Sequence, residues 1–278
     1  MSTKGGAGKS LLAQQIIPMA FFYNDKKKKS DFSLFLVDTK NKNEMESGFS
    51  STFKEIVTVR SIDDIAVDML SNEIEDRGLD ENKRIIVDAG GGENTVAVTK
   101  ALGTLFDLDD SLILIPTFLD SEYIESVQTT ITEIKKERDD ANICVIVNKV
   151  SKGHYEEAKR IGVGIEEYIT EYISVNLNKK KLWSRITQES SSIICYPDMS
   201  NFVKCIPEGK AVLDIIEDNL LDENLTYQNE AKQLKEEFIA GNMQKNELME
   251  AKSNLVAKHR LVELYNNSIG LFESLKEK

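Results

Sequence analysis

Cysteine is scarce in this chain of 278 residues, and its three copies follow no metal-ligand spacing. Cys144, Cys195 and Cys205 are an odd number, and no signal-peptide pattern precedes them. A reducing cytoplasm is therefore the simplest compartment, and we expect the thiols to be buried in the core.

Positive charge and long apolar runs are also lacking. The chain carries 35 lysines and arginines against 47 aspartates and glutamates, which gives a net charge of −12. This balance argues against a surface built throughout for nucleic acid, although it leaves room for a local basic patch. The longest apolar stretches, such as residues 111–116, suit a strand but are far too short to cross a membrane.

What the sequence does contain is an alternation of short apolar runs and helical patterns. Runs typical of buried strands lie at 32–37, 55–59, 84–87, 111–115, 143–147 and 192–196, and helical patterns lie at 10–23, 62–75, 95–106, 121–138 and 208–220. This alternation predicts an α/β fold, in which helices cover both faces of a doubly wound, mostly parallel sheet. Ligands of such sheets bind at the carboxyl ends of the strands.

The pattern changes near residue 225, which divides the chain into a predicted domain of residues 1–224 and a helical C-terminal extension of residues 225–278. In the extension, acidic and basic residues balance, and Leu248, Leu255, Val262 and Ile269 fall seven apart. Three interpretations stay open: amphipathic helices packed on the domain, a dimer or partner helix, and a membrane-surface helix. Lys258 at a core-facing heptad position weakens the coiled-coil interpretation.

A glycine-rich loop opens the chain at residues 4–10, KGGAGKS. Its glycines allow backbone N–H groups to close around phosphate oxygens, and the positive end of the following helix adds to the attraction. Lys9 is placed to reach the β and γ phosphates of a nucleotide, and Ser10 to ligate Mg²⁺. The predicted nucleotide-binding residues here are Lys4, Gly5, Gly6, Ala7, Gly8, Lys9, Ser10 and Leu11.

The general pattern G-x-x-x-x-G-K-[ST] fails in this loop, because Thr3 stands where its first glycine belongs. The lysine that opens the loop instead resembles the deviant Walker A motif of the ParA/MinD family of dimeric ATPases. The resemblance implies a P-loop NTPase fold, an ATP-sandwich homodimer and a Lys4 that reaches the partner's phosphates. Such a lysine stabilises charge only when two subunits meet, as an arginine finger does.

The run at residues 84–87 is followed by Asp88, within a string VDAGGGEN that looks like the version in plasmid ParA proteins. By resemblance, Asp88 holds Mg²⁺ through water, and the glycines after it lie where the γ phosphate is sensed. Asp38 matches the first aspartate of the family's D-x-D, whereas Lys40 replaces the second, which helps to position the attacking water. The resemblance thus implies slow hydrolysis or another water-positioning group, with metal residues Ser10, Asp38 and Asp88 and catalytic residues Lys4, Lys9 and Asp38.

Asn148 and Lys149 follow the run at 143–147, where this family places its base-reading asparagine. A guanine site would want N-K-x-D, whose carboxylate faces the guanine N1 and N2 hydrogens, but Ser151 stands at the fourth position. Adenine is therefore favoured. Pro197 and Asp198 look like the family's final segment, whose proline-containing loop borders the adenine.

The family also has a central strand before the loop, and here only Met1, Ser2 and Thr3 precede it. We expect either a start upstream of Met1 or a reduced pairing of the first residues. Without a central strand, its two neighbours in the sheet would each lack a ladder partner.

The resemblance implies partners as well. Nonspecific DNA would contact a basic cluster of Lys179, Lys180, Lys181 and Arg185, with residues 26–29 as a second cluster, although solvated loops flanking helices explain both equally well. We expect the bacterial cytoplasm, at the nucleoid, with a ParB-like or other adaptor protein and no membrane partner.

Three functions are compatible with these features. The first is a ParA-like ATPase that partitions a plasmid or chromosome segment or assists conjugation. The second is a catalytically degenerate ATP-binding switch that uses its helical tail to bind a partner. A metabolic P-loop enzyme is the least favoured, because the sequence reveals no separate substrate pocket.

Overall fold

The computed structural model describes residues 8–18, 32–37, 55–59, 72, 84–104, 111–198, 227–256 and 259. Every described pair of neighbouring strands is parallel, and the strands form two sheets of three strands each. The predicted α/β class with parallel strands is therefore confirmed. The predicted helices at 62–75 and 208–220 lie outside the described residues, apart from Asn72, which is helical.

The first sheet has the order β2-β1-β3, with β1 at Phe32–Val37, β2 at Glu55–Val59 and β3 at Arg84–Ala89. Residues 33–37 of β1 are all buried. Side chains of a strand alternate between two faces, so burial of consecutive residues means that both faces are covered. The expectation of a strand buried on both faces is confirmed here.

The second sheet has the order β4-β5-β6, with β4 at Leu112–Thr117, β5 at Asn142–Val150 and β6 at Ser192–Pro197. Strand β5 continues three residues past the predicted end at Val147. The β5–β6 register shifts between Val147 and Val150, and Lys149 within this irregularity has a φ of +58°. Asn148 and Lys149 therefore lie inside a bulged strand end, which re-aims their side chains, and not in a loop after the strand.

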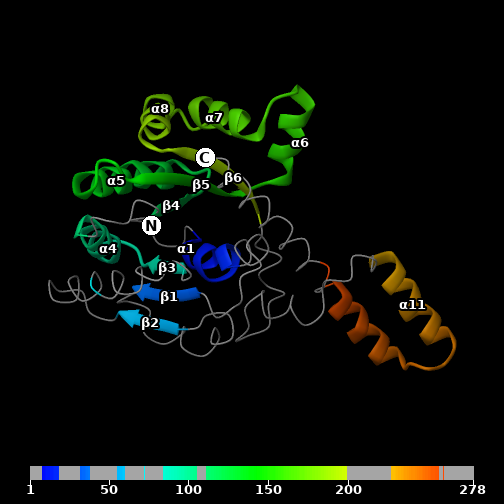
Figure 1. Cartoon of the computed structure of the whole chain (residues 1–278). Helices are drawn as coiled ribbons and strands as arrows, with labels where there is room; N and C mark the ends of the chain where they lie inside the picture. Colours follow the sequence, from blue (N-terminus) through cyan, green and yellow to red (C-terminus); the bar gives the residue numbers. More distant parts are fainter. Residues whose placement is uncertain are drawn as a thin grey trace.

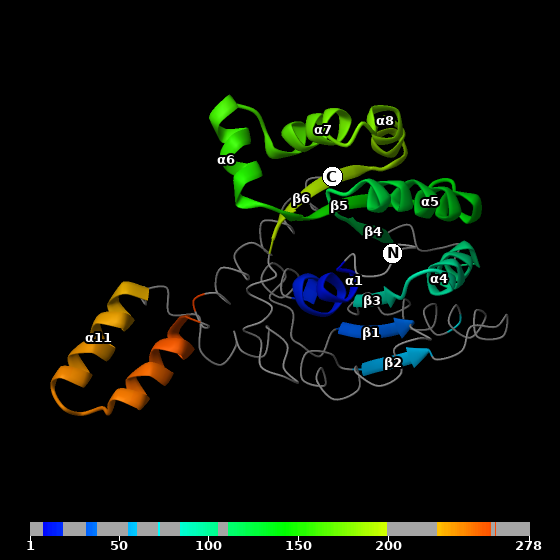
Figure 2. The same ribbon diagram turned by 180° about the vertical axis from the view of Figure 1, so that it is seen from behind.

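The described strands form two separate sheets, whereas the sequence predicts a single sheet. Each of β3 and β4 pairs along one edge only within the described strands. Figures 1 and 2 show the two sheets one above the other, with β3 and β4 on the sides that face each other. Their carboxyl ends carry Asp88–Ala89 and Thr117, and of these residues Asp88 is a predicted ligand contact.

The helix after the loop lies between the two sheets (blue in Figures 1 and 2). It begins with α1 at Lys9–Leu11 and continues as the π-helical turn η1 at Leu12–Ile16, both of which contact β3. All five residues of η1 are buried. A helix on the surface of a domain buries only one stripe, so the η1 turn is covered on all sides.

Helices flank the second sheet. Helix α5 is Ser121–Glu137, α6 is Lys152–Ile161, α7 is Ile165–Val175 and α8 is Lys180–Glu189, while α4 at Glu93–Thr104 follows β3. Helices α4 and α5 match the predicted patterns closely, but α6 to α8 were not predicted. Helix α6 buries one residue, Ala158, and α8 buries two, Trp183 and Ile186. So few buried positions leave no readable apolar period.

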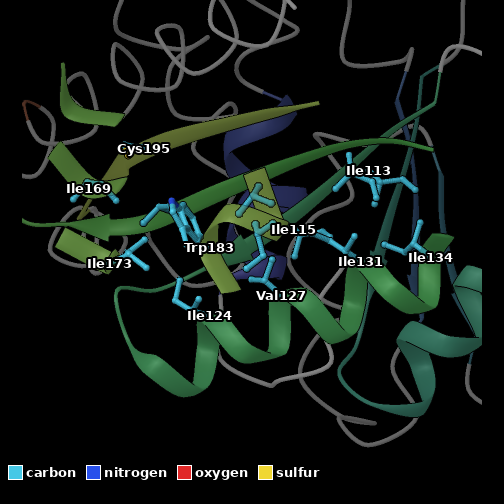
Figure 3. Packing of buried hydrophobic residues seen from close by; sticks show 14 of the residues in the cluster. Ile113, Ile115, Ile124, Val127, Ile131, Ile134, Ile169, Ile173, Trp183 and Cys195 are labelled. Atoms are coloured by element: carbon cyan, nitrogen blue, oxygen red, sulfur yellow. The ribbon is translucent and has the colours of Figure 1, made fainter. Parts of the chain in front are cut away.

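The main core lies between β4–β6 and the helices α5, α7 and α8, as Figure 3 shows. Ile124, Val127, Ile131 and Ile134 of α5 recur at intervals of three and four residues and face the sheet. Trp183 of α8 is almost fully buried, and its indole N–H donates to Thr170 Oγ1 at 3.3 Å. Cys144 and Cys195 are buried cysteines outside any disulfide, as predicted, and Cys205 lies outside the described residues.

The tail forms two helices, α11 at Tyr227–Ile239 and a second helix at residues 245–256, which project to one side of the sheets (Figures 1 and 2). His259 Nε2 lies 2.7 Å from Glu230 Oε2, so the end of the second helix returns to the start of α11. The heptad residues Leu248 and Leu255 are buried. None of the helices in the described part of the chain is long and apolar enough to cross a membrane.

Candidate functional site

The carboxyl end of β3 brings the first predicted site residues together. Asp88 is buried, and the side chains of Ser10 and Gln14 both hydrogen-bond to its carboxylate. Gln14 Nε2 donates to Asp88 Oδ2 at 2.9 Å, and the Lys9 ammonium is close enough to act on the same carboxylate by its charge. The loop lysine, the loop serine and the aspartate at the end of β3 thus share one small region.

Burial sets the electrostatics of this region. Desolvation raises the pKa of Asp88, and the hydrogen bonds from Ser10 and Gln14 and the charge of Lys9 act against that rise. A buried carboxylate that keeps a raised pKa despite these partners is short of positive charge. A cation placed beside it would supply that charge.

The segment after Asp88 is fixed by hydrogen bonds on both sides of Gly90. Its N–H donates to Val37 O at 2.7 Å, and its carbonyl accepts from Thr95 Oγ1 at 2.9 Å. A Cβ on Gly90 would overlap the Asn94 amide, whereas one on Gly92, which has a φ of +63°, would meet no atom within 4 Å. The start of α4 therefore holds Gly90 in place next to the carboxylate.

The described part of the loop contacts the second sheet. Gly8 has a φ of +87° and lies against the amide of Asn148, so closely that a Cβ on Gly8 would overlap Asn148 Nδ2. Only glycine adopts this backbone conformation at little cost. Because Asn148 belongs to β5, this contact joins the loop to the end of the second sheet.

The Asn148 side chain is 2% exposed, and only one of its two polar atoms has a hydrogen-bond partner in the described structure. Its Oδ1 accepts from the Lys149 backbone N–H at 2.8 Å, which fixes the orientation of the amide. Its Nδ2 is buried, and within the described structure no group accepts a hydrogen bond from it. Buried amide donors without an acceptor are rare and costly, so this nitrogen is suited to a ligand that presents an acceptor.

The other residues predicted to border the base lie at the ends of β5 and β6. The Lys149 ammonium lies 4.6 Å from the centroid of the Phe118 ring, a cation–π arrangement. Pro197 is the register partner of Val150, and the Asp198 N–H donates to Val150 O at 3.1 Å. The ladder thus places Pro197 and Asp198 beside the strand end that carries Asn148.

The remaining predicted site residues fall in different places. Leu11 is partly buried at the end of α1. Five predicted residues lie outside the described residues, namely Lys4, Gly5, Gly6, Ala7 and Asp38. Lys40 and the cluster at 26–29 lie outside them too.

The basic cluster near α8 is only partly available. Lys180, Lys181 and Arg185 are exposed, whereas Lys179 is ion-paired with Glu125 of α5. Helix α7, which packs beside α8, presents exposed Glu166, Glu167 and Glu171. The exposed basic residues of this cluster are therefore three, all on α8, and the neighbouring helix carries exposed acidic residues.

Sequence reasoning missed Gln14. The string LLAQQII places two glutamines in an otherwise apolar helical stretch, and both are buried. Two consecutive polar residues within an apolar stretch could have signalled a buried polar partner, since the helix has no polar face to hold them.

Comparison with models of known protein families, and with curated protein sequences, finds no match to this chain. The geometry at the strand ends therefore carries the functional argument by itself.

Proposed function

We propose that this chain is a ParA-like P-loop protein that binds ATP with Mg²⁺ and hydrolyses it. One observation carries the proposal: Lys9 and Ser10 of a glycine-rich loop meet the buried carboxylate of Asp88 at the end of a parallel strand. A lysine, a hydroxyl and a carboxylate in this arrangement are what a nucleotide with its magnesium ion requires.

The residues present fit both parts of the ligand. Ser10 offers one oxygen atom to a hard cation directly and Asp88 another through a bound water, which suits Mg²⁺ because it takes its other ligands from water and phosphate. Within the described ranges, no three acidic, histidine or cysteine side chains are placed so that they could hold a metal ion together. The unpartnered Asn148 Nδ2 suits a ring nitrogen acceptor of the base.

Bound Mg²⁺–ATP supplies the scissile phosphoanhydride, and the chain's residues then act on it in separate ways. Lys9 neutralises charge on the β and γ phosphates, and the left-handed Gly8 lets the backbone approach them. Ser10 and Asp88 would hold the cation. By the resemblance, Lys4 and Asp38 would complete the site across an ATP-sandwich homodimer, with Lys4 acting on the partner's nucleotide.

Fluorescent ATP-analogue titration of the purified full chain tests the binding step. We expect Mg²⁺-dependent binding that unlabelled ATP displaces better than GTP. Lys9→Ala should weaken binding by at least about tenfold, since it removes a charged contact. Lys100→Ala replaces an exposed lysine on α4, outside the loop, and serves as the matched control. Binding by Lys9→Ala equal to that of Lys100→Ala would refute the proposal.

A second candidate function, an ATP-dependent assembly switch with little turnover, is favoured by the projecting tail. Phe238, Ile239 and Met249 are exposed large apolar residues on its two helices. The narrow basic surface on α8 makes DNA binding weak and steeply salt-dependent under the first function. A gel shift with nonspecific DNA at low salt, with and without ATP, separates the two. If ATP causes no shift, the DNA-partitioning function is excluded and the assembly switch is the remaining candidate.

A further inference from the structure

Gln14 is a buried polar residue to which neither the loop motif nor the strand-end motifs assign a role. It lies in η1, is 4% exposed and belongs to the helix enclosed between the two sheets. Burying a side-chain amide costs free energy unless its polar atoms find partners. The partner of its Nε2 is Asp88 Oδ2, at 2.9 Å.

The local helix geometry explains how the contact arises. Ser10 and Gln14 are four residues apart, so they project from the same side of the helix, and both hydrogen-bond to Asp88. The turn that carries Gln14 is π-helical, and single π-turns within helices occur frequently at functional sites. The carboxylate thus has one partner from each of two successive turns.

We propose that Gln14 is a positioning residue for the metal site. Its amide occupies Asp88 Oδ2 and thereby fixes the rotation of the carboxylate, so that Asp88 and Ser10 stay together for the cation. Carboxylates that bind metals are themselves usually held by hydrogen bonds, and losing such a partner weakens metal binding. The inference rests on the proposed function, because it concerns the Mg²⁺ that accompanies the nucleotide.

A purely structural role for Gln14, as a link between the helix and β3, predicts a different result. Losing such a link would lower the stability of the protein without altering how nucleotide binding depends on Mg²⁺. The magnesium dependence is therefore the decisive measurement. It is measured as the Mg²⁺ concentration that gives half-maximal binding of a fluorescent ATP analogue.

The test uses the full chain and three variants. Gln14→Met keeps the length of the side chain and removes the donor, and Gln14→Asn keeps the amide but shortens its reach. Gln15→Met makes the same apolar change at the neighbouring buried glutamine, whose exposure is 8%, and is the matched control. Unfolding midpoints report whether each variant folds. If Gln14→Met does not fold, the Mg²⁺ requirement of Gln14→Asn tests the inference.

We expect both Gln14 variants to raise the half-maximal Mg²⁺ concentration by about tenfold. Nucleotide affinity in excess chelator, and the Mg²⁺ requirement of Gln15→Met, should change by less than about twofold. An unchanged Mg²⁺ requirement in the Gln14 variants, or an equal rise in Gln15→Met, would overturn the inference while the proposed function stands. A wild-type chain that binds no nucleotide would overturn both.

Discussion

Replacing Gly8 by alanine should destabilise the nucleotide-free protein through two separable effects. The first is backbone strain, because a φ of +87° costs a residue with a Cβ about 1–2 kcal/mol. The second is overlap between the new Cβ and Asn148 Nδ2. Asn148 cannot turn away freely, since its Oδ1 is held by the Lys149 N–H at 2.8 Å, and breaking that bond costs about 1 kcal/mol. The two effects together predict a loss of about 2–3 kcal/mol.

Gly162 provides the control that isolates strain from overlap. It ends α6 with a φ of +77°, and a Cβ on it would meet no atom within 4 Å. Gly162→Ala should therefore cost only the strain, about 1–2 kcal/mol. Urea unfolding of the wild type and both variants measures the difference in unfolding free energy, provided that the dependence on urea concentration (the m value) is the same for all three. A Gly8→Ala loss no larger than that of Gly162→Ala would refute the contact between Gly8 and Asn148.

A double-mutant cycle then assigns the excess to Asn148. Asn148→Ala removes the overlapping group together with an unsatisfied buried donor, so its own cost should be small. In the Asn148→Ala background, Gly8→Ala should lose about 1 kcal/mol less stability than in the wild type. Strictly additive losses would show that the overlap is relieved elsewhere. Nucleotide affinity should fall in Asn148→Ala although its stability changes little.

Three further outcomes are expected. Thr95→Val should lower the free energy of unfolding in urea by about 1–2 kcal/mol. It removes the hydroxyl that donates to the Gly90 carbonyl at 2.9 Å. An unchanged free energy of unfolding would show that Gly90 is not held by α4. Burial raises the pKa of Asp88, so the folded protein binds that proton more tightly than the unfolded chain, and the charged form costs stability at neutral pH. Asp88→Asn should accordingly stabilise the nucleotide-free protein near neutral pH, lose that advantage below the ordinary pKa of 3.8, and abolish the Mg²⁺ dependence of nucleotide binding. Burial, and secondarily the charge of Glu166, raises the pKa of Cys195 to about 12, so iodoacetamide at mildly alkaline pH should modify Cys195 only after unfolding, as peptide mass spectrometry would detect.

The strands and the residues that follow them could be predicted because their signals are local. The run at 32–37 coincides with β1, and that at 55–59 with β2. Asp88 stands at the end of β3, where the order of elements required it. Buried parallel strands read as continuous apolar runs, and this signal needs no knowledge of the neighbouring strand.

The bulge at the end of β5 could not be predicted in the same way. The apolar run stops at Val147, but the strand continues to Val150 because Pro197 and Asp198 of the neighbouring segment pair with it there. The left-handed φ of Lys149 follows from that pairing and not from its side chain. Where a strand ends therefore depends on its partner, which the local sequence does not specify.

For the tail, the sequence predicts the helices but not what they pack against. Its seven-residue spacing predicted helices correctly, but the spacing alone fits a helix packed within the chain as well as one that binds a second molecule. The burial of Leu248 and Leu255, together with the pairing of His259 and Glu230, places this stripe inside the described tail. These two positions of the stripe are therefore used within one chain and are not left for a partner.

The loop and the helix after it contact both sheets, through one hydrogen bond and one close packing contact. Gln14 reaches Asp88 in the first sheet, and Gly8 contacts Asn148 in the second. No described strand pairs β3 with β4, so the two halves meet through these contacts at the strand ends and through the packing of α4 against α5. A ligand that engages Lys9 and Ser10 on one side and Asn148 on the other would bridge both sheets. Its binding energy would then oppose their separation, which couples the occupancy of the site to the integrity of the fold.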